Sequence, residues 1–216
     1  MKRYKGAIFD LDGTLVDTLQ DIADAMNYVL EQRELPLFDY ERYKYFVGKG
    51  LRMLVDQVVP PATDQETAEQ IYREMIDRYR NRLVEKSVLY DGIAELLDLL
   101  VERKIQLSVL SNKADELVQP IVRQLMSQWP LAFVYGLKET LPRKPDPTSA
   151  LLICKQMGLL PSEVIYLGDT NVDMETACKA GFFSVGVTWG FRTEEELRKA
   201  GAMEIIHHPS QLVQLL

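Results

Sequence analysis

The feature that most constrains the fold is a set of short apolar runs that alternate with helical patterns. Each run has the length of a buried strand and is followed, within two residues, by an acidic or hydroxyl side chain. The runs cover residues 6–9, 105–110, 164–167 and 182–187, and the helical patterns cover residues 93–101, 146–157 and 172–180. Strands that alternate with helices predict an α/β protein whose parallel sheet has helices on both faces.

One long segment, from about residue 17 to residue 83, departs from this alternation. Apolar side chains recur at helical spacing in residues 19–30 and 71–83, and Pro36 and the pair Pro60-Pro61 separate these stretches. We therefore expect an α-helical cap domain over residues 17–83. It is inserted into a Rossmann-like core domain made of residues 1–16 and 84–216.

The composition limits the possible ligands. The chain has 216 residues, 47% of them apolar, and a formal net charge of −7. A general nucleic-acid binder needs clustered Lys and Arg, so no nucleic-acid partner is expected. A small phosphorylated metabolite remains a possible partner, because it needs only a local positive site. The sequence does not define the oligomeric state.

The sequence also bears on the cellular compartment. Its apolar stretches are much shorter than the roughly 20 residues of a membrane span, and the opening MKRYKGAIFD has no long apolar segment typical of a secretory leader. The two cysteines, Cys154 and Cys178, form no CxxC pair and have no metal-ligand neighbours. We expect a cytoplasmic protein with no membrane partner.

The segment FDLDGTLVDT, residues 9–18, places two carboxylates directly after the first predicted strand. Asp10 would be rigidly aimed and suits a nucleophile, and Asp12 could deliver and remove a proton, provided that their environments differ. Gly13 permits a sharp turn there. The same residues are equally consistent with an Asx turn that closes a strand.

Further polar residues follow the other predicted strands, so they should face one crevice at the carboxyl edge of the sheet. Ser111-Asn112 could bind an anion or cap a helix, and Lys144, next to Pro145, could neutralise a phosphate or be a solvated loop lysine. Asp169 and Asp173 are hard oxygen ligands suited to Mg²⁺, or residues of a helix N-terminus.

Four segments, in this order, resemble those of the haloacid-dehalogenase-type phosphatase superfamily, and the resemblance covers essentially the whole chain. They are FDLDGTLVDT, LSNK, RKPDP and GDTNVD. The resemblance implies phosphotransfer with Asp10 as nucleophile and Asp12 as general acid and base. It implies that Ser111 and Lys144 bind phosphate, with Asn112 beside them.

The resemblance also implies a metal site. Mg²⁺ would be held by the Asp10 side chain, the Asp12 main-chain carbonyl and Asp169, and Asp173 would support this ligand shell. Dehalogenases of the superfamily lack the second aspartate of the first segment, so Asp12 favours phosphate chemistry through a short-lived aspartyl phosphate.

A glycine-rich segment in the expected cap, YFVGKGL, is similar to the VGxGL segment of phosphoglycolate phosphatases. We expect Gly48, Lys49, Gly50 and Arg52 to take part in substrate choice, with Lys49 or Arg52 meeting a second negative charge. An ordinary turn between two helices with exposed basic residues is an equal alternative. The segment is not a P-loop, because the preceding glycine and the following Ser or Thr are missing.

These features predict a Mg²⁺-dependent phosphatase that hydrolyses a small phosphate monoester, with phosphoglycolate as the favoured substrate. A sugar-phosphate mutase similar to β-phosphoglucomutase, a pyrophosphatase and a nucleotidase share the same expected core. A phosphate-binding regulatory module without turnover is the alternative from another class. The sequence alone leaves hydrolase and mutase open.

Overall fold

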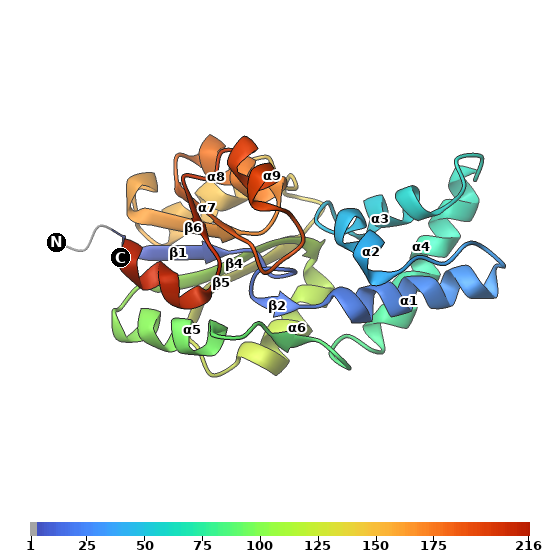
Figure 1. The fold of residues 1–216 in the computed structure, drawn as a ribbon, viewed down its shortest axis with the longest axis horizontal. Helices are drawn as coiled ribbons and strands as arrows, with labels where there is room; N and C mark the ends of the chain where they lie inside the picture. Colours follow the sequence, from blue (N-terminus) through green and yellow to red (C-terminus); the bar gives the residue numbers. More distant parts are fainter. Residues whose placement is uncertain (1–3) are drawn as a thin grey trace.

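Within residues 4–216, which the computed structural model describes, the centre of the molecule is a six-stranded parallel sheet (Figure 1). Residues 1–3 belong to the predicted core domain and to the opening segment MKRYKGAIFD. They lie outside the described residues. The strand order is β5-β4-β1-β6-β7-β8. The bounds are β1 Gly6–Phe9, β4 Gln106–Ala114, β5 Leu131–Leu137, β6 Val164–Gly168, β7 Phe183–Val187 and β8 Glu204–Ile206.

The register of the central strands fixes where the site forms. Phe9, the last residue of β1, pairs with Val109 of β4 and with Leu167 of β6. Because these strands are parallel, the residues that follow them emerge at the same edge of the sheet. Asp10 and Asp169 are therefore brought to one level, although 159 positions separate them in the sequence.

Helices cover both faces of the sheet, as the sequence predicts (Figure 1). Ala7 and Phe9 pack in one apolar cluster with α5, whereas Ile8 packs in another with α7 and α8. This alternation explains why all four residues of β1 are buried. The helices are α5 Ile93–Glu102, α6 Asp115–Met126, α7 Thr148–Gln156, α8 Asn171–Ala180 and α9 Glu194–Lys199, with short 3₁₀ turns at Pro161–Glu163 and Pro209–Leu215.

The helices α1 to α4, hereafter the helical insertion (residues 19–80), lie together beyond one end of the sheet (Figure 1). They are joined to the core through β2 Val16–Asp17 and β3 Val88–Leu89, which pair antiparallel. The insertion has its own apolar cluster, which Leu117 and Phe191 of the core also join. The helices are α1 Leu19–Gln32, α2 Tyr40–Phe46, α3 Leu51–Val58 and α4 Gln65–Arg80.

The predicted fold class is confirmed, and the differences lie in single elements. The strand expected over residues 105–110 continues to Ala114, and the helix expected to reach residue 83 ends at Arg80. Among the described residues, no helix is long and apolar enough to cross a membrane.

Candidate active site

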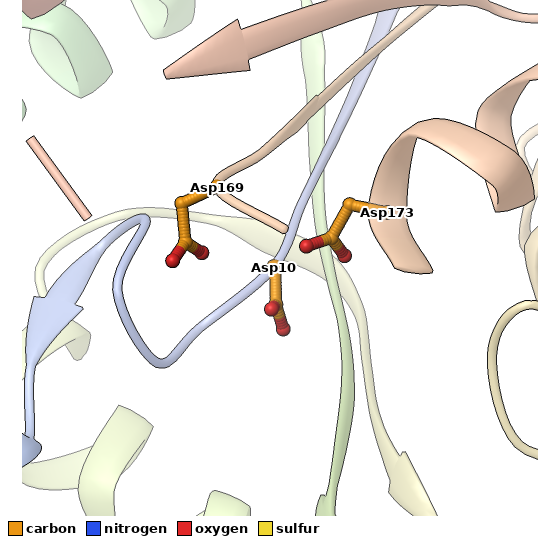
Figure 2. Close-up of side chains that lie close together, drawn as sticks. All are labelled: Asp10, Asp169 and Asp173. Atoms are coloured by element: carbon orange, nitrogen blue, oxygen red, sulfur yellow. The ribbon is translucent and has the colours of Figure 1, made fainter. Parts of the chain in front are cut away.

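Three carboxylates gather at the carboxyl edge of the sheet (Figure 2). Asp10 follows β1, Asp169 follows β6, and Asp173 lies in the first turn of α8. Each offers an oxygen that lies within 4.8 Å of the others, and all three side chains are buried. The sequence predicts that Asp10 and Asp169 share a metal ion and that Asp173 supports it.

Asp10 and Asp169 are held by hydrogen bonds from residues close to the strand ends. The Leu11 N–H donates to Oδ1 of Asp10 at 2.7 Å. The Thr14 hydroxyl donates to Oδ1 of Asp169 at 2.8 Å, and the Phe191 N–H donates to its Oδ2 at 2.9 Å. Both carboxylates are therefore oriented by the folded chain itself.

Asp173 combines a helix-capping role with its place in the cluster. Its Oδ2 accepts hydrogen bonds from the N–H and hydroxyl of Thr170, at 3.1 Å and 2.6 Å. Its Oδ1 accepts a hydrogen bond from the Tyr166 hydroxyl at 3.3 Å. The helix-start alternative and the site prediction for this segment are thus compatible, because one carboxylate serves both.

Lys144 is the cation of the cluster. Its Nζ lies 2.9 Å from Oδ1 of Asp10 and 2.6 Å from Oδ1 of Asp173, and the side chain is buried. This geometry argues against the alternative of a solvated loop lysine.

Asn112 holds the backbone of Lys144 in place. Its Oδ1 accepts from the Lys144 N–H at 2.9 Å, and its Nδ2 donates to the Lys144 carbonyl at 3.1 Å. The same Nδ2 donates to the Gly48 carbonyl of the helical insertion at 3.2 Å. Its two amide hydrogens are therefore both used, so the Asn112 side chain positions Lys144 and is not free to bind an anion.

The cluster carries an excess of negative charge. Burial, and then the charge of Asp173, raise the pKa of Asp10 to about 7, against the lowering effect of Lys144. Burial and the charges of Asp173 and Asp10 raise the pKa of Asp169 well above its ordinary value. Burial acts to lower the pKa of Lys144, but the charges of Asp10 and Asp173 hold it well above its ordinary value. One ammonium thus faces three buried carboxylates.

This donor set fits a divalent cation. Carboxylate oxygens are the hard ligands that Mg²⁺ prefers. A cation among them would stabilise their charged forms against burial and against the like-charge repulsion that together raise their pKa values. Asp173 already accepts hydrogen bonds on both oxygens. Asp10 and Asp169 are therefore better suited to bind the ion directly.

Asp12 lies in a separate polar environment, although only one residue separates it from Asp10. Its Oδ1 accepts a hydrogen bond from the Thr18 hydroxyl at 2.6 Å and forms an ion pair with Lys113. Lys113 is buried and donates to the Tyr79 hydroxyl of α4 at 2.8 Å. The two aspartates thus have different environments, as two different roles require.

Lys113 was missed by the sequence analysis. It belongs to the segment LSNK, in which Ser111 and Asn112 are the predicted site residues. A lysine near a strand end is normally exposed, and its partner Tyr79 comes from the distant insertion. The one available signal was its position two residues after Ser111, on the same strand.

A small cavity separates these residues from the helical insertion. Its volume is about 20 Å³, which is room for about one water molecule. It is lined by Asp10, Asp12, Ser111, Asn112 and Lys113 of the core and by Val47, Gly48, Gly50, Leu51 and Leu54 of the insertion. The insertion is therefore closed over the site in this structure.

The two glycines of the insertion approach the core closely. A Cβ atom at Gly48 would lie 3.2 Å from Cγ2 of Thr170, and one at Gly50 would lie 3.1 Å from the Asn112 carbonyl oxygen. Both glycines have a positive φ, 116° and 90°, which other residues rarely adopt. The glycine-rich segment is therefore shaped to fit against the site.

The two basic residues of this segment are placed differently from the glycines. The Arg52 guanidinium donates to the Ala68 carbonyl at 3.0 Å and lies 3.4 Å from Asp56, within the insertion itself. Lys49 lines a neighbouring groove together with Arg143 and Lys144. Neither Lys49 nor Arg52 lines the cavity that Asp10 and Asp12 share.

A further contact between core and insertion comes from Arg192, whose role the sequence did not indicate. Its guanidinium donates to the carbonyls of Lys44 and Val47, the latter at 3.1 Å, and lies 5.1 Å from the ring centroid of Tyr45. These carbonyls are at the C-terminal end of α2, where a helix leaves carbonyl groups unpaired.

The sequence and the fold both match known proteins. Residues 7–187 match the family described as Haloacid dehalogenase-like hydrolase. A phosphoglycolate phosphatase of Chromobacterium violaceum is 33% identical over 224 residues, which span 100% of this chain and 98% of that protein. An N-acetylmuramic acid 6-phosphate phosphatase of Pseudomonas aeruginosa is 31% identical over 215 residues, spanning 99% and 95% of the two chains.

Solved structures of other proteins have the same fold as this chain. A crystal structure from Lactobacillus delbrueckii subsp. bulgaricus, provisionally described as a phosphoglycolate phosphatase, superposes with a TM-score of 0.93 at 29% identity and covers 99% of this chain and 98% of its own. A β-phosphoglucomutase of Clostridium difficile, 20% identical, covers 97% and 93% with a TM-score of 0.77 and so shares the fold. The chain therefore belongs to the haloacid dehalogenase-like hydrolase family and is an enzyme of its phosphatase type.

Proposed function

We propose that this enzyme hydrolyses a small phosphate monoester through a phosphoryl group carried on Asp10, with Mg²⁺ as cofactor and phosphoglycolate as the favoured substrate. The observation that carries the proposal is the placement of Asp10. Its buried carboxylate lies 2.9 Å from Lys144 and has an oxygen within 4.8 Å of one of Asp169, and it borders the same cavity as Asp12.

In the proposed first step, a carboxylate oxygen of Asp10 attacks the phosphorus atom and the bond to the leaving oxygen breaks. Asp12 protonates that oxygen as it leaves and then removes a proton from the water that cleaves the aspartyl phosphate. Thr18 and Lys113 hold Oδ1 of Asp12, so Oδ2 is the atom that carries this proton.

Three residues would bind the transferring phosphoryl group or position those that do. Lys144 offsets the charge of its oxygens, and the Ser111 hydroxyl, which borders the cavity, donates a hydrogen bond to it. Asn112 acts indirectly, since its amide holds the backbone of Lys144.

The side chains of Asp10 and Asp169 and the main-chain carbonyl of Asp12 would hold Mg²⁺, with Asp173 supporting them through Lys144. When bound, the ion would supply positive charge next to the phosphoryl oxygens, so that an anionic carboxylate can approach an anionic ester. The raised pKa values of Asp10 and Asp169 support this assignment, because they arise from burial and from neighbouring carboxylates, and a bound cation would offset both effects.

We propose residues 17–83 as a cap domain that controls access, with the rest of the chain as the core domain. A cavity of about 20 Å³ is too small for any phosphate ester, so the cap must open for substrate and product. Phosphoglycolate is favoured because the segment YFVGKGL is similar to that of phosphoglycolate phosphatases and because the Chromobacterium violaceum relative bears that name.

The test is a panel of phosphate esters with Mg²⁺ or with a chelator, comparing kcat/KM for phosphoglycolate, pyrophosphate, nucleoside monophosphates and hexose phosphates. We expect release of inorganic phosphate without a sugar acceptor, highest kcat/KM for phosphoglycolate, and loss of activity on chelation. No turnover of any ester by the metal-loaded enzyme would favour a regulatory module, and turnover that requires a sugar acceptor would favour a mutase.

A further inference from the structure

The proposed reaction uses one buried cation next to the cavity, Lys113, only to hold Asp12. The Lys113 side chain is only 1% exposed, and its ammonium contacts Asp12 and the Tyr79 hydroxyl. An ammonium has three N–H donors. Within residues 4–216, Asp12 and Tyr79 account for its polar side-chain partners, which leaves one donor for a ligand.

The surroundings of Lys113 differ from those of Lys144. Lys144 lies among the carboxylates where the phosphoryl group would bind. Lys113 lies on the side of Asp12, the residue that would protonate the leaving oxygen, and borders the cavity. On that side the insertion contributes mainly apolar groups, from Val47, Leu51 and Leu54. The leaving group would thus meet the Lys113 cation of the core opposite the apolar side chains of the insertion.

The other basic residues near the insertion are placed less suitably. Arg52 is engaged with Ala68 and Asp56 on the insertion, and Lys49 lines a groove outside the cavity. A short leaving group attached to a phosphorus at Asp10 stays close to Asp12, because both aspartates border the same small cavity. Lys113, which contacts Asp12, is therefore a cation within its reach.

We propose that Lys113 is the specificity-determining residue of this enzyme, and that it selects esters whose short leaving group carries a carboxylate. The inference rests on the proposed phosphatase function and names the chemistry of the substrate at the same site. It replaces the expectation that Lys49 or Arg52 meets the second negative charge. Tyr79, reaching from α4, holds the Lys113 ammonium at the cavity when the insertion is closed.

The experiment compares two esters of nearly the same shape, phosphoglycolate and its neutral carboxamide, 2-phosphoglycolamide. Wild type should prefer the acid. Lys113→Met should lower kcat/KM for the acid by about tenfold to hundredfold more than for the amide, mainly through KM, since a charge-assisted hydrogen bond is lost. Lys113→Arg should retain the preference for the acid. Lys49→Met removes a positive charge at the alternative position. It should leave the ratio of kcat/KM for the acid to kcat/KM for the amide at the wild-type value.

An equal loss on both esters in Lys113→Met would overturn the inference, because it would mean that Lys113 only positions Asp12. A changed ratio in Lys49→Met would overturn it as well. The wild-type comparison needs no variant, so it can overturn the inference even if Lys113→Met does not fold, and Lys113→Arg then tests the residue itself. Wild type that hydrolyses both esters without preferring the acid overturns this inference and leaves the phosphatase proposal standing. Wild type that hydrolyses no phosphate ester overturns both.

Discussion

The strand ends of the core and the helical insertion contribute to the site in different ways. At the strand ends, buried side chains are held by several hydrogen bonds each, as for Asp169 between Thr14 and Phe191. The insertion contributes the backbone of Gly48 and Gly50 and an apolar wall. The comparison supports the proposal that the core supplies both the chemistry and the charged group that selects the substrate, whereas the insertion controls access.

Two of the core residues that contact the glycine-rich end of the insertion bind main-chain carbonyls. Arg192 donates to carbonyls at the end of α2, and Asn112 donates to the Gly48 carbonyl. Such contacts can break and reform without disturbing the carboxylate cluster. This arrangement suits a cap that opens while the chemical groups stay in place.

The largest effect is expected from the proposed nucleophile. Asp10→Asn should lower kcat by about 10⁴-fold or more, because the amide cannot form the covalent intermediate. The measurement is phosphate release, with the far-ultraviolet circular dichroism spectrum and the melting temperature as controls for folding. A correctly folded variant with full activity would break the assignment of the chemistry to the strand ends.

The next effect concerns the metal site. Asp169→Asn should weaken Mg²⁺ binding at least about tenfold, because a proposed ligand loses its charge. Calorimetric titration of the metal measures this change. Mg²⁺ should also raise the melting temperature of wild type by preferential binding to the folded state, and the variant should lose most of this increase. Unchanged affinity would place the ion elsewhere.

A smaller effect is expected where the insertion joins the core. The buried Asp21 of α1 accepts hydrogen bonds from the Lys86 N–H and from both the N–H and the hydroxyl of Ser87, the last two at 2.8 Å and 2.6 Å. Asp21→Ala leaves these donors unpaired and should lower the free energy of unfolding by about 1–3 kcal/mol.

The matched control is Asp24→Ala on the same helix. Asp24 pairs with Lys86 and Tyr40 at the exposed surface, so its loss should cost less than about 0.5 kcal/mol. Chemical denaturation of both variants gives the comparison. Equal destabilisation by the two substitutions would show that Asp21 does not anchor the junction.

The smallest effect is expected from the contact between core and closed insertion. Arg192→Met removes the hydrogen bonds to the Lys44 and Val47 carbonyls and should weaken closure by about 1 kcal/mol. We expect KM to rise about fivefold, with a smaller change in kcat. A fall in kcat of several hundredfold with unchanged KM would instead mean that Arg192 acts in the chemical step. The core and the insertion would then not have separate roles.

The sequence predicts the core of the site because its elements have local signals. The buried strands before Asp10 and Asp169 are continuous apolar runs, and the parallel alternation places their ends together. The strands β5 and β8 have weaker signals. β5 is an edge strand whose residues are mostly half-buried, and β8 has three residues, too few for a pattern.

Features that depend on distant partners could not be predicted. The surroundings of Lys113 depend on Tyr79, and the Arg52 guanidinium is bound by the carbonyl of Ala68. Both Tyr79 and Ala68 belong to α4. The local sequence predicts neither contact, because each depends on how the helices of the insertion pack. The partners of Lys113 and Arg52 could therefore be identified only from the structure.

The most direct test of the proposed mechanism is to identify the residue that carries the phosphoryl group during turnover. The enzyme is mixed with phosphoglycolate and Mg²⁺, quenched in acid and reduced with borohydride, which converts an aspartyl phosphate to homoserine, and its peptides are analysed by mass spectrometry. We predict homoserine at position 10 in wild type and none in Asp10→Asn. Reduction at another residue, or a phosphoenzyme that persists in Asp10→Asn, would contradict the mechanism.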